Sequence, residues 1–347
     1  GMSWNDTLGN LRVLDKWRAD AGIEFSVEKS INRVNTLDNR KLGANQGIIP
    51  KRSIPGLEKQ ASAVALGFED FKTFSSGAIL LDAFWEKGGN IFDTAFIYGG
   101  GYTEKLWGEW QKRSGVREQA VLIGKGAHSP LVYPDVIAKQ LTQSLDRLQT
   151  DYVDLYYAHR DDKETHLEDV ASGFDALVKA GLAHELGASN FDAGRLAAVH
   201  TIAHSNGMTP FTVLQNEYNV VVRDSYGPEL QRLCTGRGIA MLPWFGLAGG
   251  FLTGKYRSRD DLAKHNRGSS VERFFEQGLK VLPVLDAIVE ETGASMAAIS
   301  LAWLMRQPGI AAPIASASKP EQLDVQFEAL KLELSEDQLE RITAAGS

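Results

Sequence analysis

Short apolar runs alternate with longer segments of helical periodicity from about residue 62 to the end of the chain. The short runs predict buried β-strands and the longer segments predict α-helices. The predicted strands lie near residues 62–68, 90–95, 120–125, 153–159, 183–189, 213–219, 239–244 and 312–318. The predicted helices lie near residues 77–88, 103–114, 134–148, 167–180, 191–205, 225–236, 279–307, 319–331 and 336–345. Eight evenly spaced strands, each followed by a helix, are typical of a closed (β/α)8 TIM barrel, an α/β fold, and favour it over an open doubly wound sheet.

The first 50 residues do not follow this alternation, so we expect an N-terminal extension (1–50) before a single barrel domain (51–347). Asn10–Ala21 can form a modest amphipathic helix, whereas Ser30–Gly47 is polar and has neither a helical nor a strand period. Such an extension can be a lid, an oligomer contact or an accessory arm on the outside of the barrel. We favour the accessory arm. The last predicted segment, 336–345, adds a C-terminal helix.

Composition narrows the class of protein. Hydrophobic residues make up 43% of the chain and charged residues 23%, which is ordinary for a globular protein. The net charge of -7 argues against a nucleic-acid partner. No apolar run has the length of a membrane helix, and the first residues lack the features of a secretory signal, so no membrane partner is expected. A single cysteine, Cys234, excludes an intramolecular disulfide and fits a reducing compartment, so we expect a cytoplasmic protein.

The glycine-rich segments exclude some nucleotide chemistry. No Gly-x-Gly-x-x-Gly motif follows the first predicted strand, so the usual dinucleotide fingerprint of doubly wound folds is missing. Gly249–Lys255 nearly matches a phosphate-binding loop, but Tyr256 stands where ATPases carry a magnesium-binding Ser or Thr. An ATPase is therefore disfavoured, whereas a loop that offers N–H groups and one lysine to a pyrophosphate fits. The polar segment Arg257–Gly278 that follows is a candidate for a mobile flap over a ligand.

Metal and serine-nucleophile chemistry have little support. His200 and His204 stand at helical spacing, but Thr201 occupies the place of the glutamate that a zinc hydrolase needs, so no metal site is expected. Ser189 lacks the glycine two residues later that a nucleophile elbow requires.

A different set of residues points to proton transfer. Three successive predicted strands finish at Asp93, Lys125 and His159, and Tyr98 follows the first of them. Side chains at the carboxyl ends of neighbouring barrel strands converge on one face. A phenol has an ordinary pKa of about 10 and becomes a useful acid beside a cation, which Lys125 can supply. Each residue alone is more often structural, but the four together indicate a catalytic site.

These motifs resemble those of the aldo-keto reductases, over about residues 55–345. The family's first signature is matched by Phe92-Asp-Thr-Ala95, Tyr98-Gly99 and Thr103-Glu104-x-x-x-Gly108. Later strands and loops of the family are matched by Asp154–Arg160, Gly187–Phe191, Leu214–Asn219, Trp244–Tyr256 and Ser316–Leu323. The nearest branch is the one shared with potassium-channel β-subunits and many bacterial reductases. The resemblance implies that Asp93, Tyr98, Lys125 and His159 are the catalytic residues.

By position, the resemblance also implies a nicotinamide dinucleotide site. Its residues would be Ser189, Asn190, Gln215, Trp244, Leu247, Gly249, Lys255, Ser318, Lys319, Gln322 and Gln326, the last at a position where the family often has Asn. Lys319 opens a predicted helix, where a cation and free N–H groups suit a phosphate dianion. Since Ser316–Pro320 holds no acidic residue to bind a bare ribose diol, NADPH is expected in preference to NADH.

The substrate pocket is less defined. Candidates near the carboxyl ends of the strands are Phe68, Phe96, His128, Arg160 and Phe245. Arg160 can attract an anionic group or pair with Asp161 or Asp162. Phe245 adds bulk, because Trp244-Phe-Gly-Leu replaces the family's usual Ser-Pro-Leu pattern, and Gly124 stands where the family commonly has Thr or Ala.

The predicted function is NADPH-dependent hydride transfer to an aldehyde or ketone, or the reverse reaction. Tyr98 would be the general acid or base and Lys125 would lower its pKa, while Asp93 holds Lys125 and His159 orients the carbonyl oxygen. A homo-oligomer is compatible with the extension. Two alternatives share the fold. One is a non-catalytic NADP(H)-sensing regulatory subunit, disfavoured by the complete catalytic set, and the other is a sugar-phosphate aldolase or isomerase with Lys125 as a Schiff base.

Overall fold

The computed structural model describes residues 4–23, 42–43, 45–69, 71, 73–128, 133–265 and 267–346. The chain divides into two compact units, Gly1–Lys41 and Leu42–Ser347. The first unit contains helix α1 (Trp4–Asp20), on which Val13, Leu14 and Trp17 are exposed. Most of the polar stretch predicted at 30–47 lies outside the described residues. The boundary after residue 50 and the accessory role of the extension stay predictions.

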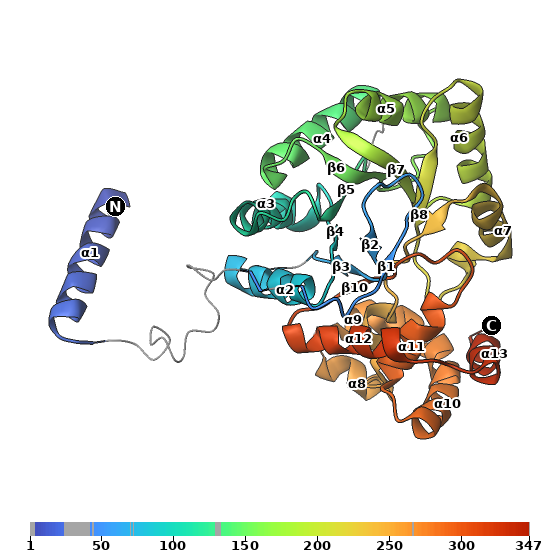
Figure 1. The fold of residues 1–347 in the computed structure, drawn as a ribbon. Helices are drawn as coiled ribbons and strands as arrows, with labels where there is room; N and C mark the ends of the chain where they lie inside the picture. The colour runs from blue at the N-terminus through green and yellow to red at the C-terminus, as the bar shows by residue number, and fades with distance from the viewer. Residues whose placement is uncertain are drawn as a thin grey trace. The chain divides into compact units, whose positions relative to one another are not determined.

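The second unit is an α/β structure built on eight parallel strands, which form a curled sheet surrounded by helices (Figure 1). The strands are β3 (Ala65–Gly67), β4 (Ile91–Asp93), β5 (Val121–Gly126), β6 (Val153–Ala158), β7 (Ala183–Ser189), β8 (Phe211–Gln215), β9 (Ala240–Met241) and β10 (Ile314–Ser316). They are neighbours in chain order from β3 to β9, and β10 pairs with β3. The eight predicted strands are therefore confirmed, with shifts of a few residues at their ends.

Hydrogen bonds also link β9 to the segment before β10. The Met241 N–H donates to the Gly309 carbonyl at 2.8 Å, and the Ala311 N–H donates to the Met241 carbonyl at 2.9 Å. Further along, the Ile314 N–H donates to the Pro243 carbonyl at 2.8 Å. The two ends of the sheet order thus share three backbone hydrogen bonds.

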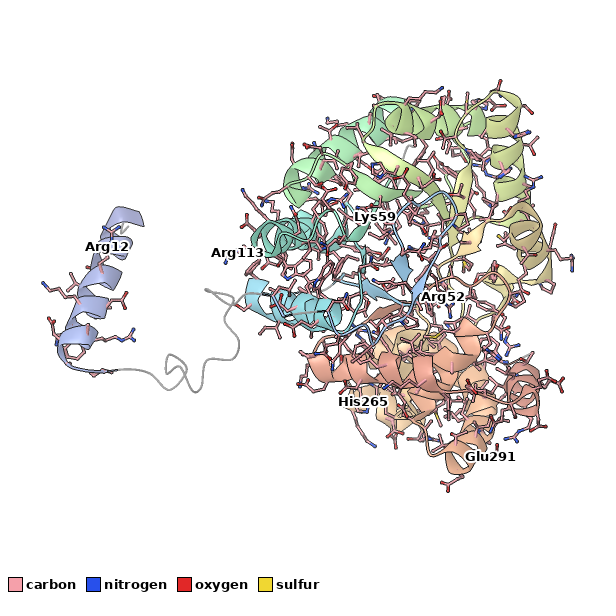
Figure 2. The ribbon with its side chains drawn as sticks, viewed as in Figure 1. Arg12, Arg52, Lys59, Arg113, His265 and Glu291 are labelled. Carbon is pink, nitrogen blue, oxygen red and sulfur yellow. The ribbon has the colours of Figure 1, made fainter. Side chains whose placement is uncertain are left out.

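The helices around the sheet bury apolar side chains. Helix α4 shows the cause, because Ile137, Leu141, Leu145 and Leu148 recur at helical spacing and are all buried. The main helices of this unit are α2 (Phe74–Glu86), α3 (Tyr102–Ser114), α4 (Pro134–Leu148), α5 (Leu167–Lys179), α6 (Ala193–Ser205), α7 (Pro228–Arg237), α10 (Phe275–Thr292), α11 (Met296–Met305) and α12 (Asp324–Lys331), followed by the C-terminal helix α13 (Glu336–Ala345). Charged side chains such as Arg113 and Glu291 lie exposed on the helices (Figure 2).

One prediction about the helices was wrong. The single helix expected at 279–307 is two helices, α10 and α11, because Gly293 adopts a left-handed conformation that ends α10 and the Ser295 side chain caps the start of α11. The segment Arg257–Gly278 contains the short helices α8 (Arg259–Lys264) and α9 (Gly268–Val271) and the first turn of α10, and its role as a mobile flap stays a prediction.

A hairpin that the sequence pattern did not reveal precedes the sheet. Its strands are β1 (Lys51–Arg52) and β2 (Ala61–Ser62), which pair antiparallel. Ile54, in the hairpin loop, is buried in the same apolar cluster as the sheet residues Ile91 and Val121. The hairpin thereby covers apolar side chains at the face where the strands begin, which we call the N-terminal face.

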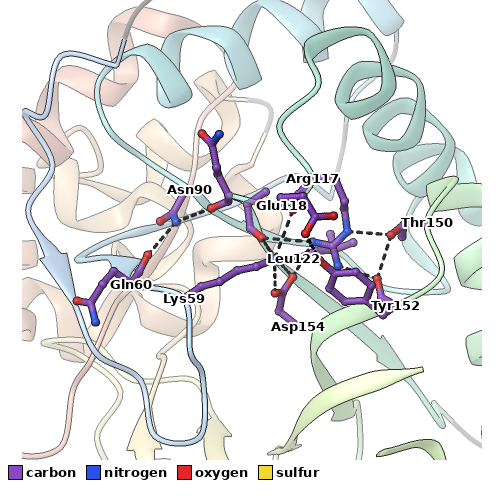
Figure 3. Close-up of polar contacts among 11 residues, drawn as sticks. Lys59, Gln60, Asn90, Arg117, Glu118, Leu122, Thr150, Tyr152 and Asp154 are labelled. Carbon is purple, nitrogen blue, oxygen red and sulfur yellow. Dashed lines mark hydrogen bonds and ion pairs between the residues drawn. The ribbon is translucent and has the colours of Figure 1, made fainter. Parts of the chain in front are cut away.

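A polar group at the N-terminal face joins the hairpin to the sheet (Figure 3). We call Lys59, Arg117, Tyr152 and Asp154 the Asp154 cluster. The carboxylate of Asp154 is 1% exposed and pairs with the Lys59 ammonium at 2.7 Å and the Arg117 guanidinium at 2.8 Å. It also accepts the Leu122 N–H at 2.9 Å. Arg117 lies 3.8 Å from the Tyr152 ring centroid and donates to the Tyr152 carbonyl at 2.7 Å.

Among the described residues, no helix has both the length and the apolar character needed to span a bilayer.

Candidate active site

The face where the strands end, here the C-terminal face, brings together side chains from β4, β5 and β8. The Lys125 ammonium is fully buried and lies 2.6 Å from one oxygen of the Asp93 carboxylate. The other carboxylate oxygen accepts a hydrogen bond from the Gln215 amide at 3.0 Å. Parallel pairing places Asp93 beside Ile123 on the neighbouring strand, two residues before Lys125, which explains the short reach between the two charged groups. The predicted pairing of Asp93 with Lys125 is present.

Tyr98 lies in a tight loop, Phe96–Gly101, that we call the Tyr98 loop. The Phe96 N–H donates to the Lys125 carbonyl at 2.9 Å, which ties the start of the loop to β5. The Tyr98 carbonyl accepts the Thr103 hydroxyl at 3.2 Å, which ties the loop to α3. Gly99, Gly100 and Gly101 all have positive φ, a conformation that glycine adopts without steric cost. The Lys125 ammonium lies 5.0 Å from the Tyr98 ring centroid.

His159 follows β6 and stands between two other rings. Its ring centroid lies 5.7 Å from that of Tyr98 and 4.8 Å from that of His128, both in edge-on geometry. Its carbonyl accepts the Asn190 amide at 3.0 Å. Its Nδ1 atom is buried and has no hydrogen-bond partner among the described residues. The four predicted catalytic side chains therefore converge, together with His128.

The pKa of Tyr98 differs from the one that the sequence predicted. Burial raises the pKa of the Tyr98 phenol well above its ordinary range, and the carboxylates of Asp93 and Glu69 raise this pKa further. The expectation that Lys125 lowers the Tyr98 pKa is wrong for this state, since the Lys125 charge is paired with Asp93 and burial disfavours the phenolate. Burial also lowers the pKa of Lys125, an effect that Asp93 opposes. Burial, followed by Lys125, lowers the pKa of His159 to about 2, so its imidazole is neutral at physiological pH.

Three of the residues predicted to hold the nicotinamide lie within hydrogen-bond distance of one another. The Ser189 hydroxyl donates to the Gln215 carbonyl at 2.7 Å, and the Asn190 amide donates to the Ser189 hydroxyl at 3.1 Å. Asn190 has a positive φ of 60°, which turns the chain sharply at the end of β7. Trp244 is half-buried, and its ring centroid lies 5.1 Å from that of Phe245.

The loop predicted to meet the pyrophosphate follows Leu247 and forms the short 3-10 helix η4 (Ala248–Thr253). Gly249 and Gly250 have positive φ, and a Cβ atom placed on Gly250 would lie 3.7 Å from the Lys255 ammonium. The Lys255 side chain therefore lies beside η4, which precedes it in the chain.

The residues predicted to surround the adenosine 2′-phosphate follow β10. The Gln322 side chain accepts the Ser318 N–H at 2.7 Å and lies 3.1 Å from the Ser318 hydroxyl. Lys319 is exposed and precedes a short 3-10 turn, η6 (Pro320–Leu323), that leads into α12. Gln326 is buried, and its carbonyl oxygen has no partner among the described residues.

Comparison with known proteins identifies the family. Residues 66–347 match the model of the Aldo/keto reductase family. This chain belongs to the aldo/keto reductase family. It is 32% identical over 281 residues to norsolorinic acid reductase A of Aspergillus parasiticus, which covers 77% of this chain and 70% of that protein. It is 29% identical over 332 residues to the NADP(+) aryl-alcohol dehydrogenase of Phanerodontia chrysosporium, which covers 86% of this chain and 85% of that protein.

A probable aryl-alcohol dehydrogenase of Saccharomyces cerevisiae is 30% identical over 280 residues, which are 75% of this chain and 84% of that protein. As an aldo/keto reductase, the protein is an NAD(P)H-dependent oxidoreductase that interconverts carbonyl compounds and alcohols. Its place in the branch with the potassium-channel β-subunits stays a prediction.

The five predicted pocket residues of this aldo/keto reductase differ in their surroundings. Phe68 is buried and stacks on Phe71, and Phe245 has a positive φ of 59° that turns its ring toward Trp244. The Phe96 ring packs under the Arg147 guanidinium, 4.6 Å from its centroid. His128 contacts His159, as above.

Arg160 is exposed. The carboxylate of Asp161, one of the two partners considered for it, instead pairs with Arg195 at 2.7 Å.

Two residues near Tyr98 were not found by sequence reasoning. Glu69 lies directly after Phe68 at a predicted strand end, so the same convergence argument could have included it. Arg147 lies in the last turn of α4, and nothing in the local pattern marks a helical arginine as part of a catalytic site. A cavity of about 610 Å³ beside Asn190 and Trp244 is also lined by Asn216 and Glu217, which lie in the motif Leu214–Asn219 but were not predicted as site residues.

Proposed function

We propose that this protein is an NADPH-dependent reductase of aldehydes or ketones, working in either direction, with Tyr98 as the proton-transfer residue. The observation that carries the proposal is the buried Asp93–Lys125 pair, 2.6 Å apart, directly beneath the Tyr98 ring. A buried charged pair beside a phenol and a neutral imidazole is an arrangement that acid–base chemistry uses.

The chain's own groups fit an NADPH molecule at the predicted positions. Lys255 and Lys319 are exposed and pair with no carboxylate among the described residues, so both cations are available to phosphate groups. The buried Gln326 carbonyl oxygen has no hydrogen-bond partner in the described part of the chain, which fits an amino group such as that of adenine. Bound NADPH would supply a hydride to the carbonyl carbon. The absence of acidic side chains in Ser316–Pro320 supports NADPH over NADH.

The protonation states assign the roles of the site residues. The raised pKa keeps the Tyr98 phenol protonated at neutral pH, as a proton donor to a developing alkoxide must be. His159 is neutral and can donate a hydrogen bond to the carbonyl oxygen without carrying a charge. Asp93 holds Lys125 in place, and the Gln215 amide in turn holds Asp93. In the oxidation direction the same phenol would have to lose its proton, so we expect oxidation to need a higher pH.

An aromatic carbonyl compound is the substrate class that we infer. Trp244 and Phe245 are half-buried and offer flat apolar surface at the face of the sheet that carries Tyr98, and stacking on such rings favours an aryl group. Relatives named as aryl-alcohol dehydrogenases support the same class.

Three points besides the activity remain part of the proposal. We infer that the curled sheet closes into a (β/α)8 barrel, a view supported by the backbone hydrogen bonds that join Met241 and Pro243 to residues 309–314. A homo-oligomer and a cytoplasmic location stay predictions.

The test of the function is Tyr98→Phe, assayed with NADPH and a panel of benzaldehydes. The variant should lose turnover by about 10²–10⁴-fold because the proton donor is gone. NADPH affinity, measured by fluorescence titration, should change by less than about twofold because no predicted cofactor residue is altered. Full turnover by Tyr98→Phe would remove the proposed role. Borohydride trapping of an adduct on Lys125 would favour the aldolase alternative instead.

A further inference from the structure

Arg147, on helix α4, contacts both ends of the Tyr98 loop. One nitrogen of Arg147, Nη1, donates to the Phe96 carbonyl at 3.1 Å and to the Glu104 carboxylate at 3.0 Å. The guanidinium also covers the Phe96 ring at 4.6 Å. At the other end of the loop, a Cβ atom on Gly101 would lie 2.6 Å from the Arg147 Cζ atom, so the guanidinium sits directly against this glycine. Tyr98 lies between these two points of contact.

The carboxylate of Glu104 restrains the Arg147 side chain. Its side chain is 0% exposed, and that of Arg147 is 23% exposed, so the pair is mostly shielded from water. Burial raises the pKa of Glu104, while Arg147 and Ser144 oppose this effect. Glu104 lies in the first turn of α3, where a carboxylate also suits the helix dipole. A planar guanidinium held by a buried carboxylate has little freedom to move.

The backbone N–H and carbonyl of Phe96 link the Arg147–Glu104 pair to Lys125. Its N–H donates to the Lys125 carbonyl and its carbonyl accepts from Arg147. The residue two positions before Tyr98 is therefore held at once by β5, which carries Lys125, and by α4.

We propose that Arg147, fixed by Glu104, is a positioning residue that sets the place of the Tyr98 phenol relative to the substrate carbonyl. This inference rests on the proposed function. Arg147 touches neither the Tyr98 hydroxyl nor any predicted cofactor residue, so its loss should act through the geometry of the loop. Misplacement of a reacting group by about 1 Å can cost about 10²-fold in rate.

The test compares Arg147→Lys and Arg147→Met with a matched control, Arg117→Lys. Arg117 also pairs with a buried carboxylate, donates to a backbone carbonyl and covers an aromatic ring, but at the N-terminal face. Benzaldehyde reduction would be followed with NADPH, with kcat, KM, NADPH Kd and the pH profile measured for each protein. We expect kcat to fall about tenfold for Arg147→Lys, which keeps the charge, and about a hundredfold for Arg147→Met. NADPH Kd should change by less than about twofold.

The pH profile separates positioning from mere stability. The groups that act on Tyr98 are Asp93, Glu69, Lys125 and His159, and none of them is altered. A loosened Tyr98 loop admits water, which moves the Tyr98 pKa down toward its ordinary value. The alkaline limb of kcat/KM for reduction should therefore shift to lower pH in the Arg147 variants and stay in place in Arg117→Lys.

Removal of Arg147 leaves Glu104 as an unpaired buried charge, so the double variant Glu104→Gln/Arg147→Met guards against loss of folding. It should fold and still show the low kcat and shifted alkaline limb. Wild-type kcat and pH profile in either Met variant would overturn the inference, as would an equal kcat loss in Arg117→Lys. The proposed function fails separately, if the wild-type protein itself reduces no carbonyl compound with NADPH.

Discussion

Two buried carboxylates at opposite ends of the sheet, Asp154 and Asp93, have different neighbouring groups. At the N-terminal face, Asp154 pairs with two cations, Lys59 and Arg117, and accepts a backbone N–H. At the C-terminal face, Asp93 pairs with one cation, Lys125, and accepts one side-chain amide. Both carboxylates lie on parallel strands, and both have partners within 3.0 Å.

The difference lies in what surrounds each carboxylate. Around Asp154, the cations donate hydrogen bonds to carbonyl groups and the Arg117 guanidinium covers the Tyr152 ring, which is an arrangement for holding the hairpin to the sheet. Around Asp93, the neighbours are a phenol with a raised pKa and an imidazole whose Nδ1 has no partner in the described part of the chain. Polar groups left without protein partners are available to a substrate, which agrees with the rule that barrel enzymes place chemistry at the C-terminal face and stability at the other.

The largest expected effect comes from removing the cation at the C-terminal face. Lys125→Met should lower turnover about 10²–10⁴-fold. It should also lower the free energy of unfolding by about 3–5 kcal/mol, because Asp93 is left buried without its charge partner. Steady-state kinetics and urea denaturation measure the two effects.

The control is the double variant Asp93→Asn/Lys125→Met, which removes both charges. Stability should largely return while turnover stays low, since the lost activity does not come from unfolding. Return of both quantities would mean that the pair has only a structural role, like the Asp154 cluster.

A smaller effect, confined to stability, is expected at the N-terminal face. Asp154→Asn leaves Lys59 and Arg117 without their shared counter-charge, and should lower the free energy of unfolding by about 3 kcal/mol. The kcat/KM of the folded variant should stay within about twofold of wild type, as measured below its unfolding transition. A tenfold loss of kcat/KM would erase the functional contrast between the two faces.

The smallest effect concerns acid stability at the C-terminal face. The folded-state pKa of His159 is lowered to about 2, below that of an unfolded histidine, so the unfolded chain binds more protons between these two values. The free energy of unfolding should therefore fall as pH decreases from about 6.5 toward 2. Between pH 7 and pH 5, the free energy of unfolding should fall by about 1 kcal/mol less in His159→Gln than in wild type. This figure is reduced for partial solvent screening. Urea denaturation at both pH values measures the difference, and identical losses would show that His159 does not titrate as a buried group.

Much of the fold could be predicted from local pattern. The eight strands and most helices were found because apolar periodicity reflects which face of each element is buried. The hairpin β1–β2 was missed because its paired segments are two residues each, too short for any period. The division of 279–307 into two helices was missed because Gly293 was taken as part of one helical pattern rather than as a helix end.

The candidate site, like the fold, could be predicted only in part from the local sequence. Asp93, Tyr98, Lys125 and His159 could be named because parallel strands bring their ends together whatever the details of packing. The sequence by itself determined the family, the strand order and the identity of these four residues. Only the tertiary structure decided that Lys125 is already paired, that burial raises the Tyr98 pKa and that Arg147 holds the Tyr98 loop. Burial and charge pairing depend on distances between residues far apart in the chain, and no local pattern encodes those distances.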